Sequence, residues 1–244
     1  MEGGAGEPSP SPTVRPDGRL CSSGSAAFGS LLTPLPPAFS GAAAVPLFAG
    51  AARYACTLAG VLSPAECQAL IAETERRGYG QALLNVGGGR EVLLTDVRDS
   101  SRCIVDSPEF ADALFARLRH ALPAAEGGWA LVGLNERLRF LRYDTPGQKF
   151  TAHRDGAFVR SQGPLAGQRT LVTLLLYLNE GYQGCFTTFY PDEGLEGLVP
   201  AQGLPVTPAP GLALLHDHNL LHAAPRLVSG VKYVLRTDVL YTPQ

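Results

Sequence analysis

The sequence predicts an α+β protein in which two N-terminal helices support a jelly roll of short antiparallel strands. Three observations lead to this prediction: residues 51–128 contain two helix-start patterns, residues 129–244 contain six short β-like runs, and Gly and Pro separate those runs. Many short strands divided by turns are typical of a sandwich or barrel, and helices can cover the outer face of one sheet. We expect one folded domain over residues 51–244, with helical support over 51–128 and the jelly-roll core over 129–244.

Residues 1–50 differ from the rest of the chain in composition. They contain 8 Gly, 8 Pro, 7 Ser and 8 Ala, which leaves little apolar surface to offset the entropy of ordering. We therefore expect a disordered tail. Its PLPP segment at residues 34–37 favours polyproline II, so an interaction protein acting through the tail is one alternative function.

Both helices are predicted from their first residues. The first begins with SPAE at residues 63–66, a capping box with Pro at the first helical position, and should end near Gly78. The second begins with SPE at residues 107–109 and should end before Pro123. Its apolar residues fall on one face, as expected for a helix packed on a sheet; they are Phe110, Leu114, Leu118 and Leu122.

The β-like runs follow a Gly pair at residues 127–128. They combine β-branched and aromatic residues with turn residues at their ends. The predicted strands are residues 136–143, 149–153, 170–178, 185–190, 212–216 and 231–241.

Charge and composition exclude several classes of protein. The formal net charge is −2 and the pI is about 6.2, so we expect neither nucleic acid nor an anionic membrane as a partner. The most apolar stretch, residues 42–62, is interrupted by Pro, Gly and Arg and does not read as a membrane span. The N-terminus lacks the basic and apolar regions of a secretory signal, and the five cysteines form no C-x-x-C pair. We expect a cytoplasmic protein in a reducing compartment.

Candidate metal ligands lie at the end of the predicted strand 149–153. His153 and Asp155 are two residues apart, so in extended backbone their side chains point to the same side. Alone this H-x-D pattern is weak evidence. Downstream, the segment HDHNLLH at residues 216–222 offers three histidines as a third ligand. Two histidines and one carboxylate on one face of a metal leave coordination positions open, as non-haem Fe(II) oxygenases require.

The last predicted strand is expected to carry a polar inner face. If this strand is regular, one of its faces carries Lys232, Val234, Arg236 and Asp238. The chain has 18 arginines but only two lysines, so an inward Lys232 is unlike a generic surface charge. Arg236 is expected either to meet a substrate carboxylate or to pair with Asp238.

Charged residues also precede the second helix. They are Asp96, Arg98, Asp99 and Arg102. We expect them to form either a lid over the site, in which Arg98 and Arg102 contact the substrate, or a solvated loop whose charges pair among themselves.

With these residues in place, the stretch 135–241 resembles the catalytic domain of the prolyl 4-hydroxylase-like Fe(II)/2-oxoglutarate dioxygenases. One departure is the turn at residues 182–184, where the family often has a Gly pair and this chain has Tyr-Gln-Gly. The matching positions are Arg142, Tyr143, Gly147, Phe150, His153, Asp155, Thr173, Tyr177, Leu178, Asn179, Gly184, Thr187, Phe189, His222 and Lys232.

The resemblance implies a double-stranded β-helix, a cupin-like barrel, and assigns roles to several residues. It implies that His153, Asp155 and His222 ligate Fe(II), since only His222 lies ten residues before Lys232. It implies that Lys232 binds the distal carboxylate of 2-oxoglutarate. Tyr143, Thr173 and Tyr177 resemble the hydroxyl donors that orient this co-substrate. His218 is left either facing the substrate or in a surface loop, and His120 complements the end of the second helix.

The implied function is a dioxygenase that uses Fe(II), 2-oxoglutarate and O₂, with ascorbate as a reductant, to hydroxylate a C–H bond. Succinate and CO₂ would be released, and the substrate would be peptidyl-prolyl or a small molecule. One alternative is a non-catalytic cupin-like module that binds a metal or small molecule. Another is a metal-dependent isomerase or hydrolase, which would not need Lys232 as a buried cation.

Overall fold

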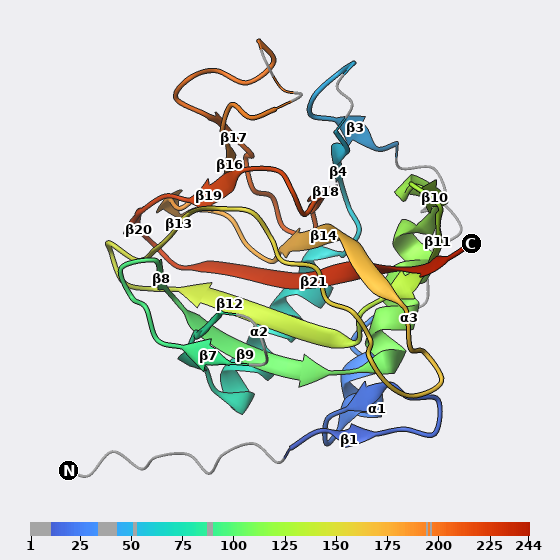
Figure 1. The fold of residues 1–244 in the computed structure, drawn as a ribbon. Helices are drawn as coiled ribbons and strands as arrows, with labels where there is room; N and C mark the ends of the chain where they lie inside the picture. Colours follow the sequence, from blue (N-terminus) through green and yellow to red (C-terminus); the bar gives the residue numbers. More distant parts are fainter. Residues whose placement is uncertain (1–10, 34–42, 51–52, 87–89, 194, 196) are drawn as a thin grey trace, which may run out of the picture.

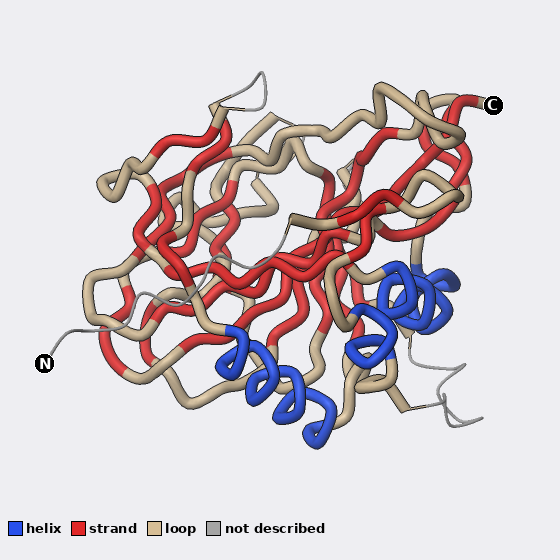
Figure 2. Tube along the Cα trace, turned by 90° about the horizontal axis from the view of Figure 1, so that it is seen from below, coloured by secondary structure: helices blue, strands red, loops and turns tan. Residues whose placement is uncertain are grey.

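The protein consists of two facing antiparallel sheets, with helices along one side of the strands (Figures 1 and 2). The computed structural model describes residues 11–33, 43–50, 53–86, 90–193, 195 and 197–244. The two facing sheets, with helices beside them, confirm the predicted α+β class and the jelly roll. No helix in the described ranges is long and apolar enough to cross a membrane.

The larger sheet has ten strands. They are β3 (Val45–Pro46), β4 (Ala55–Leu58), β5 (Gly80–Gln81), β9 (Ser101–Asp106), β10 (Ala125–Glu126), β11 (Trp129–Leu134), β12 (Arg137–Tyr143), β14 (Arg169–Tyr177), β18 (Ala213–Asp217) and β21 (Lys232–Pro243). The order is β3-β4-β18-β14-β21-β12-β9-β5, and β11 pairs with both β10 and β21. The long strand β21 therefore runs through the middle of the sheet (Figure 1).

The smaller sheet has five strands in the order β17-β16-β19-β13-β8. They are β8 (Arg98–Asp99), β13 (Lys149–His153), β16 (Thr188–Phe189), β17 (Leu204–Pro205) and β19 (His222–Ala224). Three further pairs stand apart from both sheets: β1 (Thr13–Val14) with β2 (Leu20–Cys21), β6 (Leu84–Asn85) with β7 (Glu91–Val92), and β15 (Gln183–Gly184) with β20 (Leu227–Ser229).

The helices are α1 (Ser25–Gly29), α2 (Pro64–Arg77) and α3 (Pro108–Leu118), followed by the 3₁₀ turn η2 (Arg119–Ala121). The capping box of α2 is confirmed: Glu66 N donates to Ser63 Oγ at 3.2 Å, and Ser63 N donates to the Glu66 carboxylate at 2.8 Å. At α3, Phe110 N donates to Ser107 Oγ at 3.2 Å. Both helices begin where their sequence patterns predict.

Strand β14 shows how the two faces of the larger sheet are used. Leu174 and Leu176 belong to the apolar cluster that includes the helices, whereas Leu175 and Tyr177 belong to the cluster between the sheets. This alternation follows from the two-residue period of a strand. The inner face of the larger sheet and the smaller sheet together enclose the candidate site.

Residues 11–33, which belong to the segment expected to be disordered, pack against the folded domain. Phe28 of α1 is 1 % exposed, and its ring centroid lies 5.3 Å from that of Phe110 and 5.6 Å from that of Phe140. The backbone N–H of Leu20 donates to Glu136 at 2.9 Å. A few apolar side chains and hydrogen bonds to residues distant in the sequence dock this Gly- and Pro-rich segment. The PLPP segment at 34–37 lies outside the described residues.

The other departures are local. Strands β4 and β9 come from the expected helical support yet join the larger sheet. The predicted strand 185–190 is reduced to β16, and Cys185 is kept out of it by a φ of 56°, which lies outside the β region.

Candidate metal and co-substrate site

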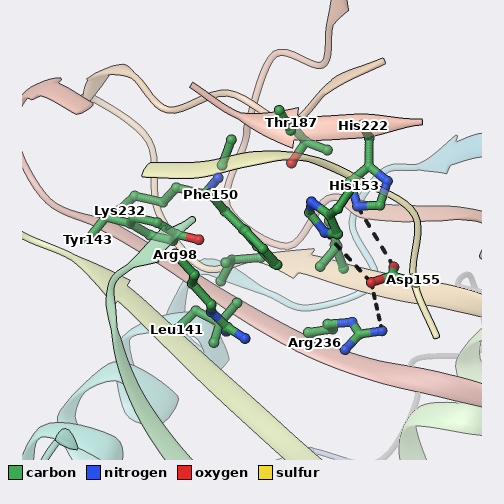
Figure 3. A pocket seen from close by; sticks show the side chains of 14 residues that line it. Arg98, Leu141, Tyr143, Phe150, His153, Asp155, Thr187, His222, Lys232 and Arg236 are labelled. Atoms are coloured by element: carbon green, nitrogen blue, oxygen red, sulfur yellow. Dashed lines mark ion pairs between the residues drawn. The ribbon is translucent and has the colours of Figure 1, made fainter. Parts of the chain in front are cut away.

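Two histidines and one aspartate meet between the sheets (Figure 3). His153 ends β13 and lies opposite His222, the first residue of β19. Asp155 follows β13 by two residues, and its carboxylate oxygens lie 3.8 Å from Nε2 of each histidine. The three ligand atoms lie within 4.8 Å of one another, which is compact enough for a single metal ion.

Backbone carbonyls fix the orientation of both imidazoles. His153 Nδ1 donates to the Thr151 carbonyl at 2.8 Å, and His222 Nδ1 donates to the Leu220 carbonyl at 2.9 Å. Since a carbonyl only accepts, each Nδ1 carries the hydrogen and each Nε2 keeps its lone pair. Both lone pairs are therefore free to bind a metal near Asp155, an orientation typical of metal-ligating histidines.

The protonation states also fit a divalent metal. Burial and neighbouring positive groups lower the pKa of His153 and of His222 to about 4, so both are neutral at pH 7. Burial acts to raise the pKa of Asp155, but Arg236 and the nearby histidines outweigh it and hold that pKa well below its ordinary value. Two neutral imidazoles and one carboxylate are a donor set suited to Fe(II).

Two side chains hold Asp155 in place. Thr173 Oγ1 donates to Oδ2 at 2.6 Å, and Arg236 Nη2 lies 3.0 Å from Oδ1. The resemblance implies that Thr173 orients the co-substrate, but the structure has its hydroxyl bonded to the aspartate. The strand register explains this position, because Thr173 lies opposite Asp238 on β21 and opposite His216 on β18.

Lys232 is buried in the same cavity as the three metal-ligand candidates. Its Nζ donates to the carbonyl of Cys185 at 2.6 Å. In the described part of the chain it forms no ion pair with a carboxylate. Burial lowers its pKa, as expected when the charged form leaves water without a counter-ion.

Three tyrosine rings surround this ammonium. Nζ lies 5.3 Å from the ring centroid of Tyr143, 5.9 Å from that of Tyr177 and 6.0 Å from that of Tyr182. Tyr143 lies directly opposite Lys232 in the sheet register. The hydroxyl of Tyr182 is buried and lacks a hydrogen bond to any described residue, whereas the Tyr177 hydroxyl lies beside Thr187. Sequence reasoning missed Tyr182, because it lies in a turn with no periodic pattern.

Four of the five remaining substrate candidates lie around a neighbouring cavity of about 690 Å³, which also reaches His153 and Asp155. Arg98 and Arg102 line this cavity from β8 and β9. They belong to paired strands and not to the loop expected for them. Arg102 binds Glu91 through two contacts of 3.1 Å.

Arg236 and Asp238 form the expected pair, with an N–O distance of 3.1 Å. Sequence reasoning missed Arg139, which contacts the same carboxylate at 3.2 Å. Its position two residues before Leu141 on the inward face of β12 is the period-two pattern that could have found it. His218 is 7 % exposed and lies 3.5 Å from Asp238, so it is neither in a surface loop nor among the residues that line the cavity.

A further buried histidine adjoins the candidate ligands. The ring centroid of His216 lies 4.6 Å from that of His222. Its Nδ1 donates to the Asp217 carbonyl at 2.9 Å, while Nε2 is buried without a hydrogen bond to a described residue. Burial lowers the pKa of His216 to about 4, so the ring is neutral at pH 7.

Three solved structures share this fold. A prolyl hydroxylase from Trichoplax adhaerens, in complex with a hypoxia inducible factor peptide fragment, has a TM-score of 0.54 and 16% identity over 76% of this chain and 82% of that chain. A prolyl-4-hydroxylase from Pseudomonas putida has a TM-score of 0.52 and 20% identity over 77% and 92%. The viral collagen prolyl hydroxylase of Paramecium Bursaria Chlorella virus-1, in its 2OG complex, has a TM-score of 0.51 and 18% identity over 78% and 97%.

These likenesses show the fold: the chain has the double-stranded β-helix architecture of these prolyl hydroxylases, and it carries a candidate His-Asp-His metal site. Each of the three matches covers about three quarters of the chain. No protein-family model and no curated protein matches the sequence.

Proposed function

We propose that the chain is an Fe(II)- and 2-oxoglutarate-dependent dioxygenase that hydroxylates a C–H bond and releases succinate and CO₂. The observation that carries this proposal is Lys232, a buried ammonium that shares a cavity with the His-Asp-His cluster and has no carboxylate partner in the described residues. A buried charge is costly unless it is paired. A ligand that brings one carboxylate to Lys232 and further oxygen atoms to the metal satisfies both ends of the cavity.

The protein's own groups would position the reactants. His153, Asp155 and His222 would hold the iron, which supplies the capacity to bind O₂ and oxidise the co-substrate. Thr173 and Arg236 keep the Asp155 carboxylate fixed. Lys232 has two N–H groups besides the one bonded to Cys185, and these would donate to the distal carboxylate of 2-oxoglutarate.

Side chains near the cavity also favour a bound oxygen-rich molecule. The buried hydroxyl of Tyr182 lacks a hydrogen-bond partner among the described residues, so a carboxylate oxygen would satisfy it. Leu141, Leu175 and Val234 give the cavity an apolar wall. Such a wall limits the access of water and would protect a reactive centre from side reactions.

The organic substrate in this proposal is peptidyl-prolyl or a small molecule, and ascorbate would serve as reductant. The fold matches to prolyl hydroxylases, one of them in complex with a peptide, support the peptidyl option. The cavity of about 690 Å³ next to the candidate ligands leaves room for either.

Anaerobic visible absorption tests the proposal. Adding Fe(II) and then 2-oxoglutarate to the purified protein should produce a charge-transfer band that needs both additions. The band should be absent in His153→Ala, and Lys232→Ala should need far more 2-oxoglutarate to reach it. Arg76→Gln provides a control, because Arg76 lies on the exposed surface of α2 and pairs with Glu73.

A folded wild-type protein that gives no band would contradict the dioxygenase proposal. A protein that binds the metal but shows no response to 2-oxoglutarate would favour the non-catalytic binding module. A band that Lys232→Ala leaves unchanged would show that another group binds the distal carboxylate.

A further inference from the structure

Arg98 is a second buried cation beside the candidate metal ligands. It is 8 % exposed, and its guanidinium carbon lies 5.0 Å from the centre of the Phe150 ring. The one hydrogen bond described for its side chain is a long contact of 3.5 Å from Nε to Ser100 Oγ. In the described part of the chain it has no salt bridge, whereas Arg102 binds Glu91 and Arg236 binds two aspartates.

The acidic groups around Arg98 already form ion pairs with other arginines. In the described part of the chain, five arginines and three carboxylates line the larger cavity. The arginines are Arg98, Arg102, Arg139, Arg154 and Arg236, and the carboxylates are those of Glu91, Asp155 and Asp238. Glu91 binds Arg102, Asp238 binds both Arg139 and Arg236, and Asp155 binds Arg236. Arg154 binds Asp192 outside this set. The cavity therefore has a surplus of positive charge.

The reactants of the proposed function leave that surplus in place. The two positive charges of Fe(II) and the two negative charges of 2-oxoglutarate cancel. One co-substrate carboxylate would meet Lys232 and the other would reach the metal, so neither is left for Arg98. Burial, together with Arg236 and Arg102, lowers the pKa of Arg98 to about 10, and the group still carries its charge at pH 7.

Arg98 lies where the two cavities meet. It lines the cavity that contains Lys232 and also the larger one that reaches Arg236. In Figure 3 it lies between the Lys232 end of the site and Arg236. A group bound to Arg98 would thus lie next to the metal ligands, on the side open to the larger cavity. A guanidinium pairs well with a planar carboxylate through two parallel hydrogen bonds.

We propose that the hydroxylated substrate carries a carboxylate, and that Arg98 binds it beside the His-Asp-His cluster. This inference rests on the proposed function. The carboxylate belongs either to a free small acid or to an Asp or Glu side chain of a peptide. Both sources offer the same chemistry, and the probes below distinguish them.

The test uses the anaerobic protein loaded with Fe(II) and 2-oxoglutarate, whose absorption band responds when a substrate binds nearby. One pair of probes is a pool of N-acetyl amino acids and a pool of the matching amides. The second pair is a set of peptides with internal Asp or Glu and the same peptides with Asn or Gln. We expect only the carboxylate members to shift the band and, after O₂ is added, to increase succinate release.

Substitutions then assign the effect to Arg98. Arg98→Gln should weaken the response to the carboxylate probe by roughly 10- to 100-fold, the usual effect of losing a hydrogen-bonded charge pair. Arg98→Lys should restore part of it, and Arg76→Gln should behave as the wild type. The concentration of 2-oxoglutarate needed to form the band should stay unchanged in Arg98→Gln, which also shows that this variant folds.

Each outcome decides the question. Amides that act as well as acids, or acids that have no effect, overturn the inference. An Arg98→Gln variant that needs as much 2-oxoglutarate as Lys232→Ala would also overturn it, since Arg98 would then serve the co-substrate. Loss of the band from the wild type, before any probe is added, would instead contradict the proposed function.

Discussion

Replacing Lys232 with Met should stabilise the ligand-free protein and remove its ability to bind 2-oxoglutarate. Lys232 is 2 % exposed, donates one hydrogen bond to the Cys185 carbonyl and has no carboxylate partner in the described structure. Met has a similar length and no charge, so Lys232→Met keeps the packing and removes the buried ammonium. Stability and ligand binding should therefore change in opposite directions.

The expected size follows from the contacts. Burying an ammonium costs several kcal/mol after relaxation. The 2.6 Å hydrogen bond to Cys185 returns about 1.5–3 kcal/mol, and the three tyrosine rings at 5.3–6.0 Å return about 0.5–1 kcal/mol each. Because these contacts offset only part of the desolvation cost, we expect a gain of about 1–2 kcal/mol. For a chain of this length that gain raises Tm by about 2–8 °C.

Thermal unfolding with and without ligands measures both effects. Without ligands, the variant should melt above the wild type. With Fe(II) and 2-oxoglutarate under anaerobic conditions, the wild type should gain about 2.7 kcal/mol at a hundredfold excess over Kd, and the variant should gain nothing from the 2-oxoglutarate. A variant that melts lower without ligands would show that protein contacts already compensate the ammonium. A variant that 2-oxoglutarate still stabilises would refute Lys232 as the anchor.

Three further substitutions test the site and its support. Thr173→Val removes the hydroxyl that binds Asp155 and should weaken Fe(II) binding about tenfold in an anaerobic titration; unchanged affinity would mean that the hydrogen bond does not orient the ligand. Phe28→Ala should lower the unfolding free energy by about 3–5 kcal/mol in urea, and a loss under about 1 kcal/mol would mean that the N-terminal segment is not part of the folded unit. Glu66→Gln strands the buried Arg117 and should cost about 3–5 kcal/mol. Burial acts to raise the pKa of Glu66, but Arg117 outweighs it and holds that pKa below its ordinary value of 4.5. The stability of the wild type should therefore fall as the pH drops below about 4.5, and Glu66→Gln should lack this contribution to the fall. Equal acid sensitivity of the two proteins would contradict the pairing.

The parts of the fold that the sequence predicts are those with local patterns. The capping box at Ser63 and the alternation along residues 170–178 each depend on neighbours a few positions away, so the chain shows them without its tertiary structure. The docking of Phe28 could not be predicted in this way, because its partners lie more than 80 residues further along the chain.

The candidate site shows the same division. His153 and Asp155 are recognisable as a pair because a strand places residues two apart on one side. The hydrogen bond from Thr173 to Asp155 depends on the register between distant strands, and so does the sharing of Asp238 by Arg139 and Arg236. Tyr182 reaches the ammonium from a turn whose shape is set by its surroundings, and no periodic pattern marks it.

Strand β21 sets the distance between the two ends of the candidate site. It carries Lys232 at one end and Arg236, which holds Asp155, four residues further on. Four residues of strand span about 13 Å, and this rigid backbone fixes the separation of the two groups. Inserting one residue between them would turn Lys232 toward the helices while leaving Arg236 in place. The length of acid that the proposed site would accept is therefore set by strand register, and changes in loop length would leave it unaltered.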